Sequence, residues 1–292
     1  MKVTSFLTKI LKIFTNKTLL KIEHSKENLY KVTTFCSILL GTLLYDSNIE
    51  LKSQEVCEAN LGDFFSSCYI TPETYKTRIY EMGLCTSDPL AGTYEDGENV
   101  VTDNTIDESN CTPVLQSESG SLVNISPGEA QSLAGENIRP PVGTYPYAYI
   151  KLSNTLGLKG KQKVNGVTYY SSSDGTGTTN IANYVEWDEK IIDFEKGPEC
   201  EPLAENRVMG ATETFTSGIT GTMKAVLSHL SGGKYVGTMQ ADCGDSTRIF
   251  GSFAPTNSIF ITSETKGLQV TFTITDKGLS VIGGSTAGKV GR

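Results

Sequence analysis

The sequence predicts a mainly β, antiparallel protein that is exported and cross-linked by disulfides. Three observations support this prediction: strand-like alternation from Thr71 onward, six cysteines beyond the first 45 residues, and an apolar stretch behind a basic leader. The chain has 292 residues, of which 38% are hydrophobic and 20% are charged, with 29 Gly and 10 Pro. This composition excludes a polytopic membrane protein, a collagen, a coiled coil and a fully disordered chain.

The apolar stretch, Val32–Tyr45, is too short to cross a bilayer, which takes ~20 residues, but has the length of a secretory signal core. A Lys-rich segment, Met1–Lys31, precedes it with apolar residues at helical spacing. We therefore expect residues 1–45 to form a helical signal or anchor segment, the only part to meet a membrane. No small-x-small cleavage site follows, so a cleaved signal, an uncleaved anchor and an ordinary buried segment stay open.

The cysteines agree with export. Two histidines and no CxxC motif give no zinc-ligand spacing, so disulfides are favoured over a metal site. Neighbour order is one of the 15 pairings that six cysteines allow. It predicts three bonds: Cys57 with Cys68, Cys85 with Cys111, and Cys200 with Cys243. The alternative is six buried, reduced thiols in a cytosolic protein.

Several strands can be placed from the pattern. Tyr75–Cys85 and Thr144–Asn154 alternate in residue type, as strands do. Asn165-Gly166 predicts a two-residue hairpin turn, because a type I′ turn needs positive φ at both central positions. A closing hairpin is expected around Asp276–Gly278. Thr222–Leu230 is predicted to be the one short helix, since its apolar residues share a helical face and glycines follow.

The domain organisation is predicted from a Ser/Gly/Thr-rich connector, Ser171–Asn180, and the prolines that follow it. After the signal or anchor segment 1–45 and a linker or donor strand 46–56, residues 57–180 form a β-sandwich domain. Residues 181–292 form a second β domain or continue the first.

One segment carries a resemblance. Ser121–Thr155 contains Pro127-Gly128, Pro140-Pro141 and Gly143-Thr144-Tyr145 in a strand, turn, strand, proline, Gly-x-Tyr, strand order. This arrangement resembles the prealbumin-like β-sandwich modules of bacterial surface and adhesin proteins. The likeness extends over about residues 75–170 if Tyr75 opens the first strand. It implies a Greek-key β-sandwich with an extracellular structural or binding role, and it carries over no catalytic residue.

Two arrangements could carry catalysis. His229 is the only histidine beyond the leader, and no GxSxG motif surrounds a serine, so a Ser-His-Asp triad has little basis. In Glu186-Trp187-Asp188-Glu189, Trp187 could stack on a sugar while Glu186 and Asp188 act as the acid and nucleophile of a glycoside hydrolase. The alternative is that Trp187 packs in the core while the acids face water. We expect no enzyme activity.

Calcium is the only cofactor that the pattern indicates, and none is certain. The segment Tyr94–Asn110 contains no Lys or Arg and offers the hard oxygen ligands that calcium needs. The candidate ligands are Asp96, Glu98, Asp103 and Asp107. A solvated acidic loop is the alternative.

The charge distribution limits the partners. Residues 1–31 carry seven Lys against two Glu, so the remaining 18 basic and 31 acidic residues give the body a net charge of −13. This acidic body excludes nucleic acid binding. Partners are expected to be copies of the chain or other surface proteins, with a glycan as a further candidate.

We therefore expect an exported structural or adhesive protein, extracellular or at the cell surface. Its sharper form is a filament subunit assembled by strand exchange, with Asp46–Val56 as the candidate donor. The alternatives are a monomeric carbohydrate- or protein-binding module, a secreted glycoside hydrolase, and a phage or virus structural protein.

Overall fold

The structure is a computed structural model. It describes residues 67–92, 103–125, 131–164, 166–194, 199–200, 207–215, 220–268, 270, 279–282 and 289–290. The predicted signal or anchor segment 1–45, the candidate donor strand Asp46–Val56 and Cys57 lie outside the described residues. No helix within the described ranges has the length and apolar character that a bilayer crossing requires.

The prediction of a mainly β, antiparallel protein is confirmed, because strands dominate and each pairing between them is antiparallel. Helical structure in the described part of the chain consists of two 3₁₀ segments, η1 (Ile181–Asn183) and η2 (Gln240–Asp245). The strands are β1 Ser67–Ile70, β2 Thr74–Cys85, β3 Cys111–Asn124, β4 Glu136–Asn137, β5 Gly143–Tyr145, β6 Tyr147–Ser153, β7 Thr155–Lys159, β8 Lys161–Val164, β9 Val167–Tyr170, β10 Trp187–Lys190, β11 Gly210–Phe215, β12 Gly221–Ser231, β13 Lys234–Gly237, β14 Arg248–Pro255, β15 Ile259–Ile261, β16 Leu279–Ile282 and β17 Lys289–Val290.

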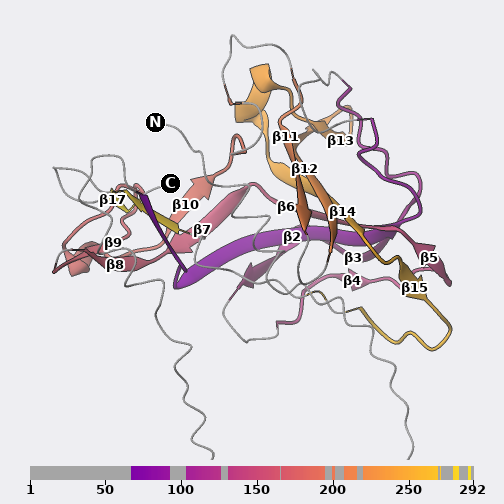
Figure 1. Ribbon diagram of the computed structural model, residues 1–292, viewed down its shortest axis with the longest axis horizontal. Helices are drawn as coiled ribbons and strands as arrows, with labels where there is room; N and C mark the ends of the chain where they lie inside the picture. Colours follow the sequence, from indigo (N-terminus) through magenta and orange to yellow (C-terminus); the bar gives the residue numbers. More distant parts are fainter. Residues whose placement is uncertain are drawn as a thin grey trace, which may run out of the picture.

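A ten-stranded sheet is the centre of the fold (Figure 1). Its main path runs β10-β7-β2-β6-β14-β12-β11, while β13 pairs with β12, and β3 pairs with β2 and β4. The long strand β2 pairs with both β6 and β7, which follow each other in the chain. From there β6 leads to β14 and β7 leads to β10, so the sheet divides into two arms.

Asn154 lies where the two arms separate, between β6 and β7. It is only 2% exposed, and its Nδ2 donates to the carbonyls of Ile191 at 3.0 Å and Ser246 at 2.9 Å. The Ile191 amide in turn donates to the Asn154 carbonyl at 2.7 Å. Since a buried polar group without partners is costly, these bonds specify the geometry of the point where the two arms separate.

The sheet is buried on both faces near its middle. Ile249 and Phe250 are neighbours on β14, so their side chains point to opposite faces, and each is 1% exposed. We call the face of Ile249 the inner face and that of Phe250 the outer face. The inner cluster is the larger and includes Ile79, Leu152, Leu156, Trp187, Phe215 and Leu227. The outer cluster is Cys85, Leu90, Ile106, Tyr149, Val208, Val226 and Phe250.

The helix predicted at Thr222–Leu230 is wrong. This segment lies within the strand β12, which pairs with β11 and β13 on one edge and β14 on the other. Leu227 packs on the inner face and Val226 on the outer face, both with no exposed surface. A strand covered on both faces is a continuous apolar run, and such a run also fits helical spacing. The glycines that follow turn the chain into β13.

Other predicted elements are confirmed. The strand expected at Tyr75–Cys85 is β2. Thr144–Asn154 is extended as expected, but it is divided between β5, which pairs with β15, and β6, which lies in the main sheet. β8 and β9 form the expected hairpin, with Gly166 at a φ of +81°. The turn of the predicted closing hairpin, Asp276–Gly278, lies outside the described residues, and β16 pairs with β1 and β17. β6 pairs with β14, so the main sheet contains residues from both sides of position 180.

Candidate functional site

Two of the three predicted disulfides lie within the described residues and are confirmed. Cys85 is bonded to Cys111 and Cys200 to Cys243. The third prediction needs Cys57, which is outside the described residues. Disulfides persist in oxidising compartments, so this pair of cross-links indicates an extracellular environment.

The first disulfide closes a loop over the outer face. Cys85 and Cys111 are also partners in the β2–β3 register, and the loop between them is described at residues 86–92 and 103–110. We call these residues the outer-face loop, which rises along β13 in Figure 1. Its Leu90 has no exposed surface and its Ile106 is 9% exposed, and both pack in the outer cluster with Phe250. The loop therefore supplies a wall of that core.

Polar contacts also fasten the loop to the strands of the sheet. Asp88 Oδ2 lies 2.8 Å from Lys224 Nζ on β12, and Asp88 Oδ1 accepts from the Ser252 hydroxyl on β14 at 3.1 Å. Asn104 exchanges two hydrogen bonds with Gly237 of β13, one from its side chain and one to its carbonyl. The strands β12, β13 and β14 thus hold the loop.

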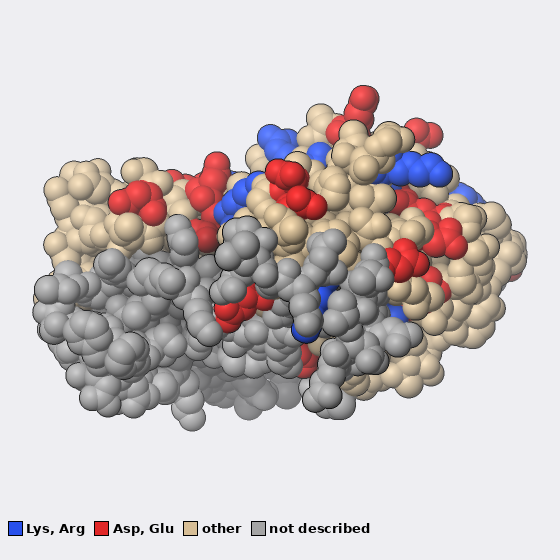
Figure 2. Space-filling view, turned by 90° about the horizontal axis from the view of Figure 1, so that it is seen from above, with Lys and Arg blue, Asp and Glu red and all other residues tan. Residues whose placement is uncertain are grey.

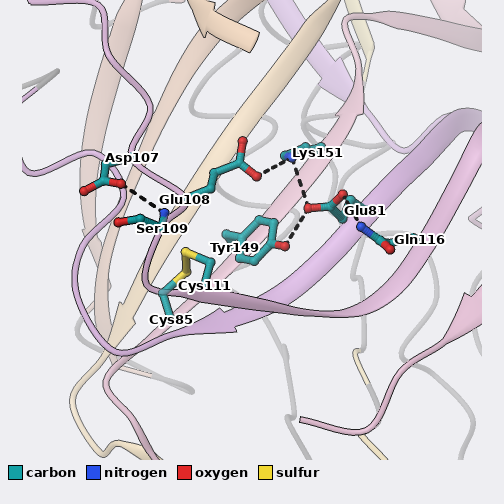
Figure 3. Close-up of polar contacts among 9 residues, drawn as sticks. All are labelled: Glu81, Cys85, Asp107, Glu108, Ser109, Cys111, Gln116, Tyr149 and Lys151. Atoms are coloured by element: carbon teal, nitrogen blue, oxygen red, sulfur yellow. Dashed lines mark hydrogen bonds and ion pairs between the residues drawn. A yellow bond between two sulfur atoms is a disulfide. The ribbon is translucent and has the colours of Figure 1, made fainter. Parts of the chain in front are cut away.

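A cluster of polar contacts on the outer face surrounds Lys151 of β6 (Figure 3). The Lys151 ammonium lies 2.5 Å from Glu108 Oε2 of the loop and 3.0 Å from Glu81 Oε1 of β2. Glu81 also accepts from the Tyr149 hydroxyl at 2.6 Å and from the Gln116 amide at 3.1 Å. We call these five residues the Lys151 cluster.

The electrostatics of this cluster favour ionised groups. Burial raises the pKa of Glu81, but the Tyr149 hydrogen bond, the Lys151 charge and the Gln116 amide outweigh it, so the pKa lies below its usual value. Burial, followed by the bond to Glu81, raises the pKa of the Tyr149 hydroxyl. Lys151 has two carboxylate partners, so the cluster offers no free nucleophile or base. It acts as a fastening between the loop and the sheet.

Two of the four predicted calcium ligands, Asp103 and Asp107, lie within the described residues. Asp96 and Glu98 lie outside the described residues. Asp103 accepts from the Thr105 amide at 2.9 Å, and Asp107 from the Ser109 amide at 3.0 Å. Hydrogen bonding to the side chain and then to the amide of Thr105 lowers the pKa of the Asp103 carboxyl, and Ser109 lowers the pKa of the Asp107 carboxyl in the same way. Each therefore stabilises its own turn. Within the described ranges, no group of three or more His, Cys, Asp or Glu could hold a metal ion.

The acids around Trp187 do not surround an open aromatic face. Trp187 is 4% exposed in the inner cluster, and its Nε1 donates to Glu189 at 3.2 Å. A Cβ on Gly175 would lie 2.9 Å from that nitrogen, so the loop backbone covers the ring. Glu186 forms an ion pair with Lys76 at 2.6 Å, and Asp188 is exposed on β10. Trp187 thus has a packing role rather than a sugar-stacking role.

His229 lies on β12, not on a helix. Its Nδ1 is 3.1 Å from the Thr238 hydroxyl, a contact between the neighbouring strands β12 and β13. This partner is neither an acid nor a nucleophile activated by one, so the contact builds no part of a triad.

The described surface mixes both signs of charge. Figure 2 shows acidic and basic side chains interspersed over the described part of one face. Interspersed charges of this kind favour solubility over attraction of a polyanion.

Sequence reasoning missed the Lys151 cluster and the contacts of Asp88. Glu81 lies in a predicted strand and Lys151 in another, so alternation placed both in the sheet. Their pairing depends on register, and Glu81 faces Lys151 only through the register shift after Ile79. The available signal was a charged residue, Glu81 or Lys151, at an otherwise apolar position of a predicted strand.

Comparisons with protein-family models, with curated proteins and with solved structures found no match for this chain.

Proposed function

We propose that the protein is an exported structural component of a surface, assembled with copies of itself by strand addition at the outer edge of β11. The proposal includes a Greek-key sandwich arrangement of the sheets and assigns no catalytic activity. The observation that carries it is the nearly uncharged outer edge of β11, which no other described strand pairs with, in a disulfide-bonded sheet protein.

The geometry of β11 suits an added strand. Among the described strands, only β12 pairs with it. The Leu227 amide donates to the Met209 carbonyl, so antiparallel alternation turns the main-chain groups of Gly210, Thr212 and Thr214 outward. The Thr212 hydroxyl is buried without a hydrogen-bond partner. A strand laid along this edge would supply partners to the outward main-chain groups of Gly210, Thr212 and Thr214.

The opposite edge, β10, is a poorer acceptor. It has four residues, of which Asp188, Glu189 and Lys190 are charged, whereas Glu213 is the only charged residue among the six of β11. Short, charged edges discourage pairing with another chain. The contrast supports β11 as the edge that accepts a strand.

The test is the assembly state of the full, oxidised chain. We expect concentration-dependent oligomers by size exclusion with light scattering, and filaments by negative-stain microscopy. Thr212→Pro should leave the chain monomeric, because proline removes an outward donor and blocks pairing. Deletion of 46–56 tests the predicted donor and should have the same effect.

The matched control is Asp188→Pro on the β10 edge, which should assemble like the natural sequence. Circular dichroism and the non-reduced mass should show that each variant keeps its strands and both described disulfides. A monomeric natural chain at all concentrations, or filaments from Thr212→Pro, would contradict the proposal.

A further inference from the structure

Arg248 lies on the outer face with short neighbours on both sides. It opens β14 and pairs with Ser153 of β6 and Ser228 of β12. Paired residues of antiparallel strands share a face, so small side chains flank the arginine on each side. The side chain therefore has room to reach Tyr80, with its Cζ 3.4 Å from the ring centroid, and it also approaches Tyr235, at 5.8 Å.

The Tyr80 ring is held in place by the neighbouring strand. Ile79 pairs with Ser121 and Glu81 with Gln116, so β3 bulges opposite Tyr80. Gly120 in this bulge has a φ of +75°, and a Cβ there would lie 2.7 Å from the Tyr80 ring. Only glycine permits both this backbone and this close approach. A ring packed this tightly fixes the position of the guanidinium that stacks on it.

The charge of Arg248 is not neutralised within the described residues. No carboxylate there forms an ion pair with it, and its Nη1 donates to the adjacent Thr247 carbonyl at 2.9 Å. Lys151, on the same face, has two carboxylate partners. A stacked cation without an acidic partner stands out in a chain whose residues 32–292 carry a net charge of −13.

An apolar surface adjoins the cation. Leu230 of β12 pairs with Tyr235 of β13, and Leu230 is 60% exposed. Its side chain and the Tyr235 ring lie on the face that carries Arg248, because Leu230 is two residues from Ser228. A fixed guanidinium therefore stands beside an aromatic and an aliphatic side chain on one open surface.

We propose that Arg248, Tyr80, Tyr235 and Leu230 form a binding site for a sugar that bears a carboxylate. The planar guanidinium matches a carboxylate through two parallel hydrogen bonds. Stacking on Tyr80 occupies the face of the guanidinium rather than its edge, where Nη1 donates to the Thr247 carbonyl and the other N–H groups remain to bind the carboxylate. Tyr235 and Leu230 offer an apolar surface to the C–H face of the sugar ring. The site is independent of the β11 edge.

The test is calorimetric titration of the full chain with tetragalacturonate and with its fully methyl-esterified form. Both ligands have the same rings, but only the first has carboxylates. We expect at least tenfold tighter binding of the acid. Arg248→Gln should weaken binding of the acid at least tenfold, and so should Arg248→Lys, which keeps the charge but loses the planar fork.

Arg139→Gln is the matched control, because Arg139 also donates to surface carbonyls, those of Thr262 and Ser263. This variant should bind the acid with the affinity of the natural chain. Equal binding of acid and ester by the natural chain would overturn the proposal without recourse to any variant. Full affinity of Arg248→Gln for tetragalacturonate would also overturn it. So would equal affinity of the natural chain for tetraglutamate and tetragalacturonate, because a peptide carboxylate would then bind as well as a sugar carboxylate.

Discussion

The two faces of the main sheet are covered in different ways. On the inner face, strands from both arms contribute to one continuous cluster of apolar side chains, from Trp187 to Phe215. On the outer face, a loop covers a smaller cluster and is fastened by the Cys85–Cys111 disulfide and by ion pairs at Asp88 and Glu108. The inner core therefore holds the fold together, whereas the outer core depends on cross-links that can be removed one at a time.

Two fully buried leucines give the sharpest comparison. Leu227 lies in the inner cluster and Leu90 in the outer-face loop, and neither has exposed surface. Leu227→Ala should lower the free energy of unfolding by about 3 to 5 kcal/mol, because strands on both sides prevent the cavity from collapsing. Leu90→Ala should cost about 2 kcal/mol or less, since the loop can relax. Urea denaturation measures both, and equal losses would refute the distinction.

Removal of the Cys85–Cys111 disulfide should have the next largest effect. Its sequence separation is 26, and the loss of loop closure predicts about 3.5 kcal/mol for Cys85→Ala with Cys111→Ala. Hydrogen exchange should rise mainly in the outer-face loop. The matched pair, Cys200→Ala with Cys243→Ala, has a separation of 43 and should cost about 0.4 kcal/mol more by the same relation. Exchange that rises equally on both faces would contradict the local role of the first bond.

The Lys151 cluster should contribute less than the disulfide. Lys151→Met leaves Glu81 and Glu108 without their cation, and we expect a loss of about 2 kcal/mol, because the Lys151 and Glu81 side chains are only 14% and 16% exposed. Lys161→Met is the matched control. The Lys161 and Glu73 side chains of its ion pair are 51% and 46% exposed. Loss of this pair should change the free energy of unfolding by less than about 0.5 kcal/mol. Similar losses in the two variants would show that burial does not decide the contribution.

Acid should lower the free energy of unfolding through the outer-face residue Glu81, by less than the Lys151→Met substitution does. The pKa of Glu81 is lowered in the folded state, so its contribution is complete above the unfolded pKa of about 4.3 and is lost as the pH falls through the lower folded value. Urea unfolding from pH 7 to pH 3 should show this loss. Glu81→Gln should flatten the profile, while Glu136→Gln, on an exposed strand, should keep it. A profile unchanged by Glu81→Gln would rule out this origin.

Local signals predicted the elements that depend on local chemistry. The hairpin with Gly166 follows from a positive φ that glycine adopts freely, and the strand at Tyr75–Cys85 follows from alternation. The disulfides between Cys85 and Cys111 and between Cys200 and Cys243 follow from neighbour order. Short loops close at the lowest entropic cost, which is the physical reason that neighbours were a good choice.

The failures occurred where burial comes from both sides. The run at Met223 to Leu230 fitted a helix because periodicity cannot distinguish a two-sided strand from a buried helix. Arg248 gave no signal either, because its stacking on Tyr80 requires strands that are far apart in the chain to lie in register.

The sequence by itself determined the compositional class, the strands with clear alternation, the glycine turn and the disulfide partners. Each depends on residues close together in the chain, or on the entropy of closing a loop. Only the tertiary structure decided which faces are covered, which strands pair at the edges of the described sheet, and which charges find partners. Those features depend on strand register, and a shift of one residue moves every side chain to the other face.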